Sequence, residues 1–241
     1  MRCLKFLGTL VEDKNDLEAF YCGFLRSSKV SCQTTITHPD IKRELDNTWH
    51  ILGLRLLIAS IKQKDSFLNQ HLVDTYLDIY RKCSPGADKN AFPELLIKRF
   101  SMDDAAFVSI LILLLDVQEL LDKLENKVSW ATSLTKFAKY LCPVYVFNLF
   151  LKNNPADHEL LLDWLVSSET RALEFLLKLI KYAVRNPATL FKRDNLLYTL
   201  RHLRARLSSL QERQLFPYNC TPLLKKIDIL QEVHLKSLMT S

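Results

Sequence analysis

The stretch Asp163-Trp-Leu-Val-Ser-Ser-Glu-Thr-Arg-Ala-Leu-Glu-Phe-Leu-Leu-Lys-Leu-Ile-Lys-Tyr182 decides the fold class of this chain. On a helical wheel of residues 169–185, four charged residues share a stripe about 60° wide: Glu174, Lys178, Lys181 and Arg185. Leucine, isoleucine and aromatic side chains fill the rest of the circumference. The segment therefore predicts a helix that is buried on nearly every side, with an ion pair between Glu174 and Lys178 one turn apart.

The same three- and four-residue spacing of apolar side chains continues through almost the whole chain, and few stretches alternate as strands do. Only four glycines are present, which leaves little material for hairpins or phosphate-binding loops. We therefore predict an all-α protein. The expected helices lie near residues 12–26, 41–62, 66–82, 93–99, 102–125, 128–140, 143–152, 156–166, 169–185, 194–211 and 222–237, with loops at 27–40, 83–90 and from 186 onward.

Helices of moderate length with short joints and no sustained heptad favour an armadillo or HEAT-like helical solenoid over a coiled coil. An irregular multi-helix array is the alternative. No repeat recurs in readable form, so the sequence defines neither a repeat period nor an oligomeric state. The chain has 241 residues, enough for one sizeable core, and we expect residues 1–241 to form a single all-helical unit.

Three helix starts are predicted from side chains that can cap a first turn. Ser101 precedes Asp103 and Asp104, whose charges suit the positive end of a helix dipole. Asn154 and Thr221 each precede a proline, which fits the first helical position because it needs no N–H there.

The positive charge of the chain is concentrated in its last third. Residues 168–241 contain 13 Lys and Arg against 6 Asp and Glu, whereas residues 1–167 contain 20 against 21. A solvated helical surface is the common reason for such an excess, and contact with an acidic protein or a nucleic acid is the alternative. The candidate partner-binding residues are Lys181, Arg185, Lys192, Arg193, Arg201, Arg204 and Arg206.

No pattern in the sequence supports catalysis or a cofactor. The glycine-rich phosphate and dinucleotide motifs, the HExxH zinc motif and the GxSxG nucleophile motif are all absent. His158 and Glu159 lack the second histidine of a zinc site, and a surface pair is the better interpretation. The three tryptophans, among them Trp164, are expected to anchor core packing. We predict no enzyme, no metal and no cofactor.

Six scattered cysteines form no CxxC pair, which is typical of reduced thiols inside the cell. The first residues resemble a signal peptide only superficially, because Lys5 interrupts a short apolar run. The most apolar stretch, 107–115, is about half of the roughly 20 residues that a membrane span needs. An intracellular protein of cytoplasm or nucleus, without a membrane segment, is expected.

A second informative segment is the connector Leu215-Phe-Pro-Tyr-Asn-Cys-Thr-Pro-Leu-Leu224. Pro217 restricts Phe216 to extended conformations, and the aromatic rings on either side of it are expected to pack together. The connector is therefore interpreted as a rigid joint before the last helix. A partner-binding site in this segment is the alternative.

At these two segments the chain resembles the Lines homolog family, regulators associated with Wnt/Wingless signalling. The residues that carry the resemblance are Asp163, Trp164, Leu215, Phe216, Pro217, Tyr218 and Asn219, within 163–170, 173–177 and 215–224. It covers a region of about 156–241. Family members are usually much longer, so the resemblance implies a short isoform, a fragment or a C-terminal portion.

The resemblance implies an armadillo-like, non-enzymatic protein that works by binding other proteins. We therefore expect a scaffold with a regulatory role in Wnt-type developmental signalling or transcriptional control. The alternative is a nucleic-acid-binding module that uses the basic last third, with an affinity that falls steeply as salt is raised.

Overall fold

A computed structural model of the chain describes residues 39–63, 71–74, 92–124, 141–154, 157–190 and 194–239. Every regular element in these ranges is helical and none is a strand, which confirms the predicted fold class at that level. The expected helices at 12–26 and 128–140 lie outside the described residues. Of the helix expected at 66–82, residues 71–74 are described, and they are helical.

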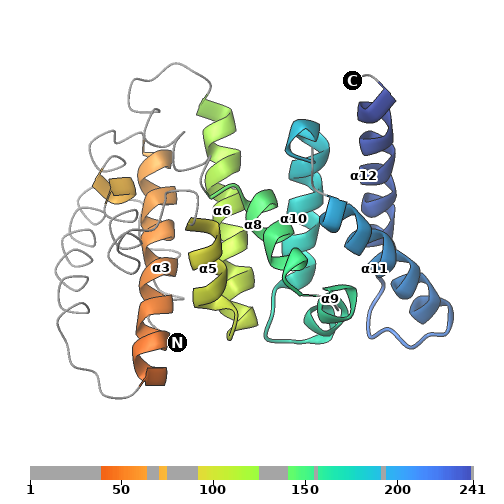
Figure 1. The fold of residues 1–241 in the computed structure, drawn as a ribbon, viewed down its shortest axis with the longest axis horizontal. Coiled ribbons are helices and arrows are strands. Elements are labelled where there is room, and N and C mark those ends of the chain that lie inside the picture. Colours follow the sequence, from red (N-terminus) through yellow and green to blue (C-terminus); the bar gives the residue numbers. More distant parts are fainter. Residues whose placement is uncertain are drawn as a thin grey trace. The chain divides into compact units, whose positions relative to one another are not determined.

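The described elements lie within three residues of the predicted bounds, except for one 3₁₀ turn where a loop was expected. They are α3 (Pro39–Lys62), α5 (Phe92–Phe100), α6 (Asp104–Leu124), α8 (Pro143–Lys152), α9 (Asp157–Val166), α10 (Ala172–Arg185), the 3₁₀ turn η2 (Pro187–Leu190), α11 (Asp194–Glu212) and α12 (Thr221–Met239), as Figure 1 shows.

Residue contacts group the chain into two compact units, and the boundary between them falls within α6. One unit contains α3 and α6 from Asp116 onward. The other contains α5, α6 up to Leu115, and every element from α8 to α12. A single all-helical unit over 1–241, with a family-like region from about 156, stays a prediction.

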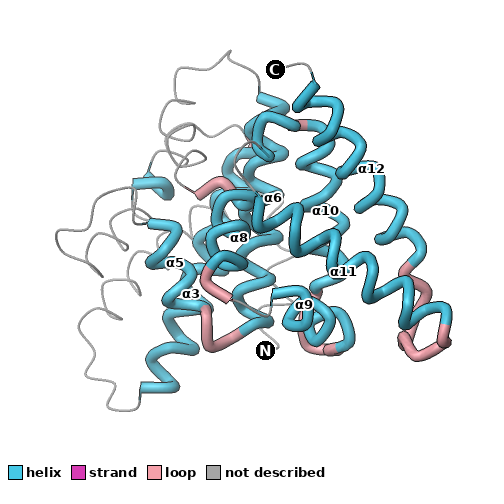
Figure 2. Tube along the Cα trace, turned by 45° about the vertical axis from the view of Figure 1, so that its right-hand side comes forward, coloured by secondary structure: helices cyan, strands magenta, loops and turns pink. Residues whose placement is uncertain are grey.

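Within the second unit, helices contact their neighbours and their next neighbours along the chain. The helix α10 contacts α8 and α12, and α11 contacts α9 and α12. Figures 1 and 2 show α10 and α12 side by side, with α11 running obliquely to them. The helix α8 also contacts α5, α11 and η2, so it has more partners than its ten residues would suggest.

The core of this unit is a cluster of aromatic rings from four helices, each at most 4% exposed. Phe150 of α8 lies 4.7 Å from Phe107 of α6 and 5.4 Å from Trp164 of α9, between ring centroids. Phe147, one turn earlier on α8, meets Phe175 of α10 edge to face at 4.8 Å. Such aromatic pairs contribute about 0.5 to 1.5 kcal/mol beyond the area they bury.

The segment 163–182 spans the end of α9 and most of α10, in agreement with the separate helices predicted at 156–166 and 169–185. Residues 167–171 join α9 to α10, and the hydroxyl of Thr170 donates a hydrogen bond to the carbonyl of Trp164. The predicted burial of α10 is confirmed for one broad face, whereas Leu173 and Leu177 are only half-buried. Trp164 lies in the core as expected. The side chain of Trp49 and the whole of Trp130 are outside the described residues.

The predicted cap of α6 is wrong by two residues. Asp103 caps this helix, since its Oδ1 accepts the N–H of Ala106 at 2.9 Å. The hydroxyl of Ser101 instead donates to the carbonyl of Lys98, 3.2 Å away, and closes the end of α5. Asp103 is favoured because it stands directly before the first helical residue, which is where a side chain reaches the third amide of the helix.

The cap predicted at Thr221 also bonds elsewhere. The hydroxyl of Thr221 accepts a hydrogen bond from Gln211 Nε2 of α11 at 2.8 Å. The helix α12 begins at Thr221 itself, with the carbonyl of Cys220 accepting its first amides. The side-chain amide of Asn154 donates to the carbonyl of Phe150 at 2.7 Å, so it closes the end of α8. The first turn that Asn154 is predicted to cap, at 155 and 156, lies outside the described residues.

The first turn of α11 receives its hydrogen bond from another helix. Asn148 of α8 is 7% exposed, and its Oδ1 accepts the N–H of Leu196 at 3.0 Å. The first amides of any helix lack partners within that helix, so a buried one needs an acceptor from outside. Asn148 therefore satisfies the amide and fixes the start of α11 against α8.

Replacement of this amide tests its role. We expect Asn148→Leu to lower the free energy of unfolding by about 1 to 3 kcal/mol, because the N–H of Leu196 stays buried without a partner. Urea unfolding followed by far-UV circular dichroism measures the change. Asn153→Leu, at an exposed position on the end of α8, is the control and should shift stability by about 0.5 kcal/mol or less. Equal losses from both variants would contradict this role.

Candidate partner-binding surface

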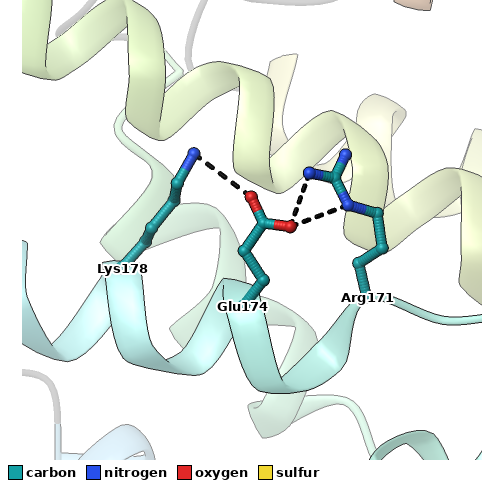
Figure 3. A network of polar contacts seen from close by, with 3 residues as sticks. All are labelled: Arg171, Glu174 and Lys178. Atoms are coloured by element: carbon teal, nitrogen blue, oxygen red, sulfur yellow. Dashed lines mark hydrogen bonds and ion pairs between the residues drawn. The ribbon is translucent and has the colours of Figure 1, made fainter.

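The polar stripe predicted on α10 exists, and half of it is already occupied by ion pairs (Figure 3). Glu174 accepts from Lys178 Nζ at 3.4 Å, which confirms the predicted pair. Its other oxygen accepts from Arg171 Nε at 2.8 Å. The candidates Lys181 and Arg185 are exposed further along the same helix. On α10, these two are the candidate cations available to a partner.

Arg204 of α11 holds α12 in place. Its Nε contacts Asp228 Oδ1, and its Nη2 donates to Asp228 Oδ2 at 3.2 Å. The hydrogen bond and the charge of Asp228 raise the pKa of the Arg204 guanidinium, although burial opposes the shift. A two-point contact between a guanidinium and a carboxylate fixes direction as well as distance. Arg204 thus orients α11 relative to α12.

The outward side of α11 carries an aromatic and basic surface. Its members are Tyr198, Arg201, His202 and Arg206, all exposed, and we call this surface the α11 face. The ring centroid of Tyr198 lies 4.2 Å from that of His202, one helical turn away. His158 of α9 lies 5.6 Å from His202. The face therefore extends from α11 toward α9.

The seven candidate basic residues do not form one cluster in the structure. Arg201 and Arg206 belong to the α11 face, whereas Lys181 and Arg185 lie on α10, whose neighbours are α12, α9, α8 and η2. Lys192 and Arg193 lie outside the described residues. The ring contact beside the arginines was missed from sequence, although the four-residue spacing of Tyr198 and His202 was its signal.

The connector between α11 and α12 begins with a reversal of the chain. Gln214 adopts a left-handed backbone conformation with φ of 57°. The N–H of Leu215 bonds to the carbonyl of Leu210 at 2.9 Å, and that of Gln214 bonds to Gln211 at 3.0 Å. This pair of bonds is the Schellman motif, in which glycine is usual at the left-handed position. It ends α11 sharply and leaves Leu215 exposed.

Tyr218 of the connector docks onto the end of α9. The rings of Phe216 and Tyr218 meet edge to face at 4.8 Å on either side of Pro217, as predicted. The hydroxyl of Tyr218 donates to the carbonyl of Leu165 at 2.9 Å. Asn219 is exposed, and its Oδ1 accepts the N–H of Thr221 at 2.9 Å. This geometry supports the interpretation of the connector as a joint.

Other chemistry is sparse in the described part of the chain. No three His, Cys, Asp or Glu side chains among the described residues gather closely enough to hold a metal ion. None of the described helices is long and apolar enough to cross a membrane. Cys142 and Cys220 are free thiols, and the thiol of Cys220 donates to Gln211 Oε1 at 2.7 Å. Burial raises the pKa of this thiol. The other four cysteines lie outside the described residues.

Comparison with known proteins shows that the segments 163–182 and 215–224 both lie in regions that match a known family. The family described as Lines N-terminus matches residues 12–192, and that described as Lines C-terminus matches residues 197–232. The chain is 31% identical to Protein lines of Drosophila melanogaster over 193 residues, which is 75% of this chain and 21% of that protein. The match reaches far upstream of the segments that carry the resemblance in sequence. No solved structure matches the chain.

The hydrogen bond from Tyr218 to Leu165 joins the two matched regions and can be tested by pH. We expect Tyr218→Phe to lower the free energy of unfolding at pH 7 by about 0.5 to 1.5 kcal/mol. Burial, with a smaller effect of Cys220, raises the pKa of Tyr218 in the folded protein. The hydroxyl of Tyr218 therefore makes its full contribution to stability below the pKa of about 10 that it has in the unfolded chain. This contribution is lost as the pH rises through the pKa of Tyr218 in the folded protein.

Urea unfolding of both proteins between pH 7 and pH 11 measures this difference. The gap in stability between the native chain and Tyr218→Phe should shrink as the solution becomes alkaline. A gap that stays constant over this range would contradict the raised pKa of Tyr218, and the absence of a gap at pH 7 would show that the hydroxyl contributes nothing.

Proposed function

This chain belongs to the Lines family, and from that premise we propose that it is a non-enzymatic helical scaffold that binds other proteins through the α11 face. The observation that carries the proposal is Tyr198, which is 58% exposed with its ring against His202. Tyrosine and arginine are enriched among the residues that dominate binding at protein interfaces. On a helical wheel, Arg201 and Arg206 lie on either side of Tyr198.

The contacts between helices support an armadillo or HEAT-like solenoid. In one row α10 touches both α8 and α12, and in a second row α9 touches α11. Alternation of this kind is how stacked helical pairs pack, and one row then forms a continuous surface for partners. The α11 face belongs to the α9 and α11 row, with His158 beside it.

Charge determines what kind of partner fits this surface. Arg201 and Arg206 are exposed on the α11 face and give it positive charge. An arginine binds a carboxylate in a two-point geometry that a lysine cannot match. The preferred partner is therefore a protein segment that combines acidic side chains with an apolar or aromatic group able to cover Tyr198.

The biological role proposed for this scaffold is regulation in Wnt-type developmental signalling or transcriptional control, in the cytoplasm or the nucleus. Family membership supports the role. The free thiols of Cys142 and Cys220 support an intracellular location. Because the aligned part corresponds to 21% of the Drosophila protein, the role rests on the family and not on the geometry of the α11 face.

A nucleic acid is the second candidate partner, and one observation favours it. The exposed ring of Tyr198 lies on the same helical face as Arg201, and an aromatic ring beside an arginine can stack on an unpaired base. The rings of the face, Tyr198 and His202, are tilted to one another, as His158 is to His202, whereas single-strand binders use successive rings on which bases stack. Steep loss of affinity with added salt is the property that would identify this mode.

Proximity labelling in cells with the intact chain and with the double variant Tyr198→Ala, Arg201→Glu tests the proposal. We expect recovery of specific protein partners to fall about tenfold or more in the variant, because each residue of this type can contribute about 2 kcal/mol at an interface. Both changes lie on exposed positions, so the fold should persist. Far-UV circular dichroism and thermal midpoints verify this for each variant.

The matched control is Arg213→Glu with Leu215→Ala, which makes the same charge change and also removes an exposed apolar group at the end of α11. Partners that bind the α11 face should be recovered equally with this control and with the native chain. Equal recovery with the face variant, or no reproducible protein partner at all, contradicts the proposal. Recovery of RNA that disappears at moderate salt favours the second candidate.

A further inference from the structure

A hollow separate from the α11 face opens between α5, the start of α6, the end of α8 and α9. Its volume is about 490 Å³, within the range of about 300 to 1,000 Å³ that is usual for ligand sites. Its floor is apolar: Ile97 and Phe150, both buried, and the half-buried Leu160. We call it the α5–α9 groove. All four segments belong to the second compact unit.

The rim of the groove is polar and carries more negative than positive charge. Glu94 and Asp104 are exposed carboxylates, and Lys98 is the basic residue among the described lining. Neither carboxylate makes a hydrogen bond or an ion pair with any described residue. Two acids that line one hollow and that pair with none of the described side chains are available to a cation from outside.

Helix ends around the groove add little to this field. The helix α5 ends at Phe100 and α8 ends at Lys152, next to lining residues Ser101 and Asn153. Carbonyl groups of these last turns already accept hydrogen bonds from Ser101 and Asn154, which reduces the partial negative charge of the two C-termini. The N-terminus of α6 is matched by the cap at Asp103. The preference of the groove for a cation therefore comes from its side chains.

The exposed side chain of Met102 marks the edge of the groove as a contact surface. It is 76% exposed and directly follows Ser101, which lines the groove. Methionine adapts to different partner shapes and is common on surfaces that bind peptides. An apolar floor, an acidic rim and an adaptable apolar neighbour together suit a ligand with a long aliphatic stem and a cationic head.

We propose that the α5–α9 groove binds an arginine side chain from a basic peptide segment of a partner protein. The aliphatic stem lies on Phe150 and Leu160, and the guanidinium lies between Glu94 and Asp104. Arginine is preferred to lysine because its planar head can contact two carboxylates at once and loses less hydration on binding. The hollow is large enough for neighbouring residues of the peptide, so the ligand is a short segment.

Fluorescence anisotropy with the full chain tests this site directly. The probe is a labelled seven-residue peptide with one central arginine between alanine and leucine residues. We expect the double variant Glu94→Gln, Asp104→Asn to weaken binding at least about tenfold, which corresponds to 1.4 kcal/mol. Lys98→Gln should strengthen binding, because it removes the competing positive charge. If these substitutions acted only by disturbing the fold, both variants would bind the peptide more weakly. Changes in affinity of opposite sign therefore indicate an effect of charge in the groove.

The control for net charge is Glu212→Gln with Glu232→Gln, two exposed acids on α11 and α12. It should change affinity less than twofold. Peptides with lysine, citrulline or glutamate at the centre should bind progressively more weakly than the arginine peptide. Binding that is unchanged in the groove variant, that is as tight for citrulline or glutamate, or that is absent for the arginine peptide overturns the proposal.

This inference stands independently of the α11 face. The variant Tyr198→Ala, Arg201→Glu leaves every groove residue in place, so it should bind the arginine peptide as the native chain does. Loss of peptide binding in that variant would also overturn the assignment of the groove, because it would place the peptide on α11.

Discussion

Contact among five buried aromatic rings determines the rest of this structure. Phe107, Phe147, Phe150, Trp164 and Phe175 come from four helices and touch in a continuous chain of ring pairs between 4.7 and 6.2 Å apart. Rings of this size fill space that no single aliphatic residue could fill, and protein cores are packed too densely to leave it empty. The relative positions of α6, α8, α9 and α10 follow from this contact.

The short helix α8 connects the aromatic cluster to both candidate binding surfaces, the α11 face and the α5–α9 groove. Phe147 faces α10 within the cluster, and the next residue, Asn148, holds the first turn of α11. One turn later, Phe150 is a ring of the cluster and also part of the floor of the α5–α9 groove. The same helix thus contributes to the aromatic cluster, to the first turn of α11 and to the floor of the groove. Neither surface can therefore move far without disturbing the aromatic contacts.

The sequence predicts what depends on neighbours along the chain and misses what depends on neighbours in space. Helix bounds and the Glu174–Lys178 pair could be predicted because periodicity and i,i+4 spacing are local. The cap at Thr221 was predicted wrongly because Gln211 of another helix competes for its hydroxyl. The pair of Arg204 with Asp228 spans 24 positions, and the groove combines four segments, so no sequence window contains either.

Native-state hydrogen exchange on Phe147→Ala measures most directly whether the aromatic cluster holds the unit together. We expect the free energy of unfolding to fall by about 3 to 5 kcal/mol. Amide protection should fall in α10 and in the first turn of α11 as well as in α8, because the three helices share the cluster and the Asn148 bond. A loss below about 1 kcal/mol, or one confined to the amides of α8, would contradict the account.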